Sequence, residues 1–406
     1  MKFGPLLVLF AIPLMAVASP YVGEIGFHAV YREGNDKKDI YPYSDARLKL
    51  DYKGISWRAR LDTTIEAAEY GATLLTREAV VSTGSSSNKI TAGFQSVKWL
   101  ENFSKHLDDP FNPQDLRRYI GVRDNTLGNL GFVHDWIKES WSVESFFWVH
   151  SFQNRLPKEE GWFDVYGVHA NELNGNSPGT NLLDRYGLGT KLRLSLWDPW
   201  EWNIYIARVM DPMPVFSATN LTDHLNDGGT YSDLKRYSHF NVMGMYGSYV
   251  AGDWVWRHDL MLTQARIMNY SEQTAAGLLI GQKKTNQYSG GLGLDYSLNP
   301  DVTLTASAFA TGILNPGSSD YFVEKQNYLI SFSLRDDQLP CGANGQIGYS
   351  RYLSSNGGYL FAVLSRTFYS SLQTGLELDY FHGNEKDVFS YASYKKQAWV
   401  HATYTF

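Results

Sequence analysis

The stretch that decides the fold is Tyr394–Phe406, with the sequence YKKQAWVHATYTF. Every second residue on one of its faces is apolar: Phe406, Tyr404, Ala402, Val400 and Ala398. The residues between them are mostly polar, and a period of two is the period of a β-strand with two different faces. If the apolar face lies in a bilayer, each strand needs a partner on both sides, because lipid does not satisfy an open sheet edge. The stretch therefore predicts a sheet that closes on itself.

The composition of the chain favours a membrane barrel. Among the 406 residues, 15% are aromatic, including 12 Trp and 27 Tyr, and the mean hydropathy is −0.32. Aromatic residues at this level suit the interfacial girdles of a barrel. After the amino-terminal segment, no run of 18 apolar residues predicts a spanning helix. The formal net charge of −6 argues against a nucleic-acid partner.

The cysteine content argues against a bound cofactor. One cysteine allows no intrachain disulfide, and there is no Cys-x-x-Cys-His motif for covalent haem attachment. We therefore expect no cofactor and no metal.

Residues 1–18 have the pattern of a secretory signal peptide. Lys2 supplies a positive charge, an apolar run follows over Leu6–Val17, and Ala16-Val17-Ala18 fits a small-x-small cleavage site. We therefore expect residues 19–406 to be exported.

Segments with a period of two recur along the whole chain and are separated alternately by short and long connections. We expect eighteen strands, at 21–32, 46–52, 57–65, 74–82, 90–99, 127–137, 141–151, 183–197, 201–210, 236–250, 254–269, 286–298, 302–314, 321–334, 345–353, 359–369, 372–382 and 391–406. Sixteen remains the alternative if the weak pair around 74–82 is not formed. Beyond Pro20, every proline falls in a connection, as expected for residues that cannot donate to a ladder.

The predicted fold is all-β: a single antiparallel, transmembrane, up-and-down β-barrel over 19–406. We expect long extracellular loops at about 100–126, 152–182, 211–235 and 270–285. The first strand begins almost at the cleavage site, which leaves no room for a plug domain.

Charged residues alternate with apolar ones on single faces of several strands. A charge facing lipid at mid-depth costs about 2–4 kcal/mol, so we expect these residues to line a wet pore. The set is Arg47, Lys49, Asp51, Arg58, Arg60, Asp62, Lys191, Arg193, Glu377 and Asp379. The four cations of the second and third strands would form one basic patch, with the two acids near the closing seam opposite them. The alternative is that the ions pair with one another in a solvated lumen.

The segment Thr91–Ile120 carries the least ordinary pattern. Seven positions stand out within it: Gly93, Gln95, Trp99, Asn112, Pro113, Asp115 and Arg117. They resemble a motif of an uncharacterised outer-membrane family related to alginate-export and porin-like barrels, although Phe94 replaces an arginine of that family. The aromatic terminal strand likewise resembles the signal read by the barrel-assembly machinery. These resemblances imply the outer membrane of a Gram-negative bacterium, with lipid, lipopolysaccharide and that machinery as partners.

The same segment suggests a constriction. Asn112-Pro113 starts a turn, and Asp115 can cap the amides of a short helical turn. We expect the loop 100–126 to fold into the pore and narrow it, through Asp108, Asp109, Asn112, Asp115, Arg117 and Arg118. An outward loop packed on its neighbours is the alternative.

The function predicted from these features is passive diffusion of small, hydrophilic, charged solutes through an outer-membrane porin. Enzyme chemistry is not expected, because no His-x-x-x-His and no Gly-x-Ser-x-Gly is present. Two alternatives remain. The barrel could be the sheath of a porin–cytochrome electron conduit with a periplasmic multihaem cytochrome inside it, or a polysaccharide-export pore.

Overall fold

The computed structural model describes residues 21–34, 38–68, 71–100, 109–114, 126–155, 185–197, 199–217, 219–229, 234–274, 277–317, 320–321, 325–354, 357–382 and 394–406. The expected signal peptide at 1–18 lies outside these residues, as does most of the expected loop at 152–182. Within the described part, no helix is long and apolar enough to cross a membrane.

The described residues contain eighteen long strands. They are β1 (Tyr21–Gly34), β2 (Lys38–Lys53), β3 (Trp57–Ala68), β4 (Gly71–Gly84), β5 (Asn88–Gln95), β6 (Asn129–Ile137), β7 (Trp141–His150), β8 (Gly187–Trp197), β9 (Trp200–Met210), β13 (His239–Ala251), β14 (Trp254–Thr274), β15 (Gly277–Ser297), β16 (Val302–Leu314), β18 (Gln326–Leu339), β19 (Ala343–Tyr352), β20 (Gly358–Phe368), β21 (Leu372–His382) and β22 (Tyr394–Thr405). Each pairs antiparallel with the next in this order. The prediction of eighteen strands is confirmed, and β4 removes the alternative of sixteen.

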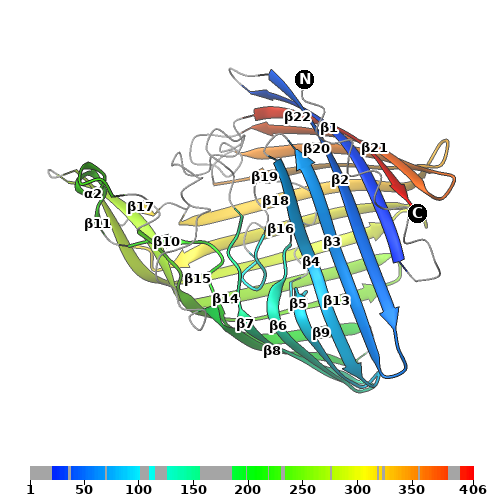
Figure 1. The fold of residues 1–406 in the computed structure, drawn as a ribbon, viewed down its shortest axis with the longest axis horizontal. Coiled ribbons are helices and arrows are strands. Elements are labelled where there is room, and N and C mark those ends of the chain that lie inside the picture. Colours follow the sequence, from blue (N-terminus) through cyan, green and yellow to red (C-terminus); the bar gives the residue numbers. More distant parts are fainter. Residues whose placement is uncertain are drawn as a thin grey trace.

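The sheet closes between its first and last strands. β1 pairs with β22, with Glu24 opposite Thr405 and His28 opposite His401. The ladder continues to the terminal residue, where Phe406 N donates to Gly23 O over 2.9 Å. Figure 1 shows β22, in red, running beside β1, in blue. The closed barrel predicted from Tyr394–Phe406 is therefore confirmed.

The two faces of the barrel differ as the alternation predicts. On β9, Ile204 and Ile206 are 48% and 61% exposed, whereas Tyr205 and Ala207 between them are 3% and 4% exposed. The exposed face is apolar all around the ring, which fits contact with lipid chains.

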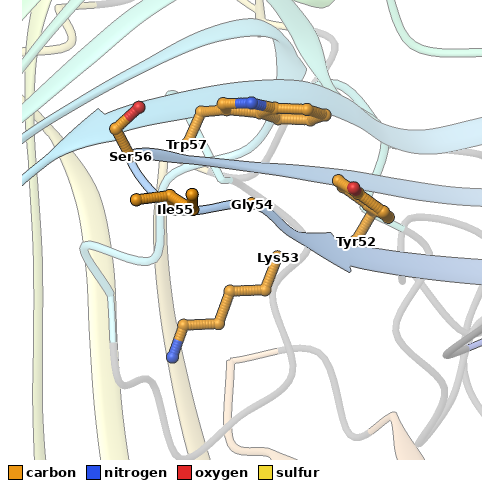
Figure 2. A pocket seen from close by; sticks show the side chains of 6 residues that line it. All are labelled: Tyr52, Lys53, Gly54, Ile55, Ser56 and Trp57. Atoms are coloured by element: carbon orange, nitrogen blue, oxygen red, sulfur yellow. The ribbon is translucent and has the colours of Figure 1, made fainter.

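Aromatic pairs mark the end of the barrel that carries the short turns. Neighbouring rings lie 4.2–5.0 Å apart in the pairs Tyr52–Trp57, Trp136–Trp141 and Trp254–Tyr296. Figure 2 shows the first pair at the turn between β2 and β3, where Lys53 points away from Trp57. Such rings suit the membrane–water interface, so this girdle marks one boundary of the membrane.

The segment 270–285, expected to be a long loop, consists mostly of paired strand. β14 and β15 continue as one ladder to Thr274 and Gly277, past a bulge at Ala265, where the register shifts and φ is 62°. Beyond this bulge polar residues occupy both faces of the hairpin, which hid the period of two. The hairpin projects past the barrel rim (Figure 1).

Short elements attach to the projecting hairpin. β11 (Thr219–Asn220) pairs with β15, and β17 (Asp320–Tyr321) pairs with β14. The expected loop at 211–235 thus contains β10 (Val215–Phe216), β11 and the short helix α2 (Leu221–Asn226), and β10 pairs with β12 (Lys235–Arg236).

A pair of adjacent substitutions on β18 tests which face meets lipid. Phe332 is 53% exposed on the apolar face, and Ser333 faces the interior. We expect Phe332→Arg to lower the free energy of unfolding in lipid vesicles by about 2–4 kcal/mol. The control Ser333→Arg places the same charge in the wet interior and should cost far less. Urea titrations followed by the gel shift of folded barrel measure both, and equal losses would contradict the assignment of faces.

Candidate functional site in the barrel interior

The four cations predicted to form a basic patch each lie against a carboxylate. The contacts are Arg47 Nε–Asp62 Oδ1 at 2.7 Å, Lys49 Nζ–Glu24 Oε1 at 2.6 Å, Arg58 Nε–Asp51 Oδ1 at 2.6 Å and Arg60 Nη2–Glu78 Oε1 at 2.7 Å. We call these eight residues, on the inward faces of β1–β4, the paired-charge wall. Their apolar neighbours Leu48, Leu50 and Tyr52 are exposed on the opposite face.

The expected patch of one sign is therefore not present among these residues. The strand register explains why, since it sets Glu24 opposite Arg47, Lys49 opposite Asp62 and Asp51 opposite Arg60. Each of β2 and β3 carries two cations followed by one acid, and the antiparallel register sets the acid of each strand opposite a cation of its neighbour. The structure supports the alternative of mutual pairing.

The two acids near the closing seam do not lie opposite these cations. Glu377 and Asp379 are on β21, which is separated from β2 only by β22 and β1. Closure of the ring brings the last strands beside the first. Both acids are 4% exposed, and Asp379 accepts hydrogen bonds from Tyr359 (2.8 Å) and Gln397 (2.9 Å). They belong to a packed seam, not to a second charged wall.

Lys191 and Arg193 on β8 are also paired. Lys191 Nζ lies 3.5 Å from Glu144, and Arg193 Nη2 lies 2.7 Å from Glu201. All six predicted cations of the pore lining thus have a carboxylate partner.

A short segment of the predicted constriction loop lies inside the barrel. Phe111 is 2% exposed, and its ring lies 5.2 Å from that of Trp99 and 5.5 Å from that of Tyr205. Tyr205 and Phe146 belong to the inward faces of β9 and β7. The segment 109–114 therefore packs on the inner wall and occupies part of the lumen.

The inward segment is held by two buried asparagines. Asn112 accepts a hydrogen bond from Val97 N (2.9 Å) and donates to Val97 O (2.7 Å) and to Asp109 (2.8 Å). Asn129 donates to Phe111 O (2.9 Å) and accepts from Phe152 N (2.9 Å). Of the six residues predicted for the constriction, Asp109 and Asn112 are placed here. Asp108, Asp115, Arg117 and Arg118 lie outside the described residues.

Among the described residues of the Gly93–Arg117 motif, Trp99 packs on this segment and Asn112 belongs to it, whereas Gly93 and Gln95 lie on β5. Gly93 has φ 131°, and a Cβ there would lie 2.2 Å from Ala79 O, so only glycine fits. Gln95 donates to Thr91 O (3.2 Å). Trp99 is 1% exposed and donates to Glu144.

The sequence analysis did not predict a large apolar cluster on the inward side of the barrel. This interior apolar cluster comprises Val97, Trp99, Phe111, Val133, Phe146, Trp148, Tyr205, Ala207, Val209, Phe240, Val242, Tyr246 and Met261. A signal was present, because segments such as Ser145–Val149 (SFFWV) and Ile204–Val209 (IYIARV) are apolar on both faces. Strands of this kind are buried on both sides. Within the described part, no group of three or more His, Cys, Asp or Glu could hold a metal ion.

A closed ring of eighteen antiparallel strands with a lipid-type exterior defines a porin-like transmembrane β-barrel. Solved structures share this fold. OccD3 (OpdP) of Pseudomonas aeruginosa has a TM-score of 0.56 and 8% identity, over 97% of this chain and 92% of that one. OccAB3 of Acinetobacter baumannii has 0.54 and 10%, over 95% and 98%. OccK2 (OpdF) of P. aeruginosa, solved with glucuronate, has 0.56 and 8%, over 95% and 97%. No family model and no curated protein sequence matches the chain.

The role of Asn112 can be tested by hydrogen exchange. Asn112→Ala removes the bonds to Val97 and Asp109, and each lost buried hydrogen bond costs about 1–3 kcal/mol. We expect amides at 97 and 111–112 to exchange more than tenfold faster. Asn88→Ala, which removes an exposed bond to His134, is the control and should leave these amides unchanged. Unchanged exchange in Asn112→Ala would show that the inward segment is held by other contacts.

Proposed function

We propose that this protein is a passive channel for small hydrophilic solutes in the outer membrane of a Gram-negative bacterium. The observation that carries the proposal is the segregation of the two barrel faces. Charged side chains such as Arg47 and Lys49 stay 27% and 38% exposed on the inward face, while the outward face is apolar. An ionised side chain exposed to this extent is stable only where it contacts water and not lipid. A wet interior across a lipid-embedded ring is a route for solutes.

The partners follow from this location. We propose membrane lipid and lipopolysaccharide around the barrel, and the barrel-assembly machinery during insertion. The inward segment 109–114 supports a narrowed pore, to which Asp108, Asp115, Arg117 and Arg118 would add charge. The predicted preference for charged solutes depended on cations without carboxylate partners. Each of the six predicted cations lies beside a carboxylate, which weakens that part of the prediction.

Two other functions from the sequence stay as alternatives. The sheath of an electron conduit requires a multihaem cytochrome inside the barrel, and co-purification of a haem-staining protein from native membranes would favour it. A polysaccharide-export pore, which the resemblance to alginate-export barrels suggests, would trap polymer in the periplasm when the gene is deleted. Solute currents through the purified barrel alone favour the porin over the sheath.

The reversal potential of the purified channel tests whether the paired-charge wall borders the pathway. Arg58→Glu with Arg60→Glu leaves Asp51 and Glu78 without their cations and adds two acids. We expect the permeability ratio of cations to anions to rise several-fold, measured in planar bilayers under a salt gradient.

A charge swap provides the control for this experiment. Arg58→Asp with Asp51→Arg exchanges the partners of one pair and conserves the net charge of the wall. Its reversal potential should equal that of the wild type. If the variant with Arg58→Glu and Arg60→Glu also has the wild-type reversal potential, the paired-charge wall does not face the ion path.

A further inference from the structure

Small, uncharged residues recur on the inward faces of β15, β16, β18 and β19. Lipid-facing Leu292 (68% exposed), Phe332 (53%) and Ile347 (52%) fix which alternate residues face inward. Many of those residues are glycines, serines and threonines, among them Gly291, Gly293, Ser307, Ser331, Ser333 and Ser350. We call this face the hydroxyl wall. One row of large side chains, Phe309, Leu329 and Tyr352, interrupts it.

The strand register arranges these residues in level rows. Gly293 lies opposite Ser307, Ser307 opposite Ser331, and Ser331 opposite Ser350. In this row the hydroxyls of Ser307 and Ser331 are 2.6 Å apart. Charges on these strands are paired near the short-turn end, where Asp295 meets Arg257 and Arg335 meets Asp337. The row of Gly293, Ser307, Ser331 and Ser350 presents hydroxyls and bare backbone.

The hydroxyl wall and the paired-charge wall are two separate arcs of the ring. Seven long strands, from β5 to β14, lie between them on one side, and three, β20–β22, lie between them on the other. The strand residues of the interior apolar cluster lie on β6, β7, β9, β13 and β14. Around the other side, Tyr359, Phe381 and Trp399 are buried at the seam of β20–β22. We call the part of the lumen that these two walls border, between the two packed arcs, the slot.

The chemistry of the two walls favours neutral solutes. A hydroxyl both donates and accepts, so it can replace the water around a polyhydroxylated molecule bond for bond. An anion entering the slot gives up hydration. The charges on the hydroxyl wall, Asp295 and Arg335, are already paired, and so are the cations of the paired-charge wall, so neither wall offers a separate charge in place of that hydration. Small side chains also leave room for a ring-shaped molecule.

We propose that the slot between the hydroxyl wall and the paired-charge wall is the solute path, and that it passes neutral polyhydroxylated solutes faster than anions of the same size. This inference rests on the proposed channel function and adds the substrate class.

Liposome swelling with glucose and glucuronate tests the inference, because these probes share one skeleton and differ by a carboxylate. With wild-type protein we expect glucose to enter several-fold faster than glucuronate. Equal or faster entry of glucuronate would overturn the neutral preference while leaving the channel function intact. If neither solute enters and the protein also passes no ion current in planar bilayers, the channel function itself fails, and the inference fails with it.

Matched substitutions on β18 test the path. Ser333→Phe places a large ring on the hydroxyl wall, and Leu334→Phe changes the adjacent residue, which is 40% exposed on the lipid face. We expect a several-fold loss of glucose entry for the first and none for the second. Ser350→Phe, on the neighbouring strand, is an independent second block. Folding of each variant is checked by its heat-dependent gel shift, and undiminished glucose entry in folded Ser333→Phe and Ser350→Phe would place the path elsewhere.

Discussion

The pairing of β1 with β22 is the constraint on which the structure depends. In lipid, each backbone N–H or C=O without a partner costs several kcal/mol, so an open edge along a strand is not tolerated. The register from Glu24–Thr405 to Gly34–Tyr394 removes that edge. Closure also requires an even number of strands, because strand direction alternates around a ring in which all neighbours are antiparallel. Both ends of the chain then lie on the same rim. It further places β21 and β22 beside β1 and β2, which decides where charged residues of distant sequence meet.

Closure of eighteen strands creates a second problem, because the enclosed space is wider than inward side chains can fill. The chain fills part of it with the segment 109–114 and the interior apolar cluster. Gly93 allows the backbone a φ of 131° next to β4, and Asn112 satisfies the backbone of Val97. Two residues of the family-like motif, Trp99 and Asn112, therefore attach this segment to the wall.

The sequence predicted the strands well and their contacts poorly, and the reason is physical. Apolar and polar residues alternate along a strand when one face contacts lipid and the other a polar interior. All eighteen strands could therefore be predicted, including the weak pair at 74–82. Pairing depends on register, which no single strand reveals; Arg47 and Asp62 are fifteen residues apart yet bonded. Alternation is weaker in the hairpin beyond Ala265, where polar residues occupy both faces, and the sequence analysis expected a loop there. On the strands packed on the apolar cluster both faces are apolar, so the strands were predicted but the cluster was not.

Paired charges in the lumen matter more for what a solute senses than for stability. An ion pair in contact with water contributes about 0–1 kcal/mol, so these pairs are a minor part of the folding free energy. Their fields, however, nearly cancel at a distance, and salt screens what is left beyond about 8 Å. A solute at the hydroxyl wall therefore meets little net field from Arg47–Asp62 or Arg60–Glu78 across the slot. Along the proposed path, shape and hydrogen-bonding capacity would then decide its passage, so the proposed substrate class follows from the hydroxyl wall and not from the paired-charge wall.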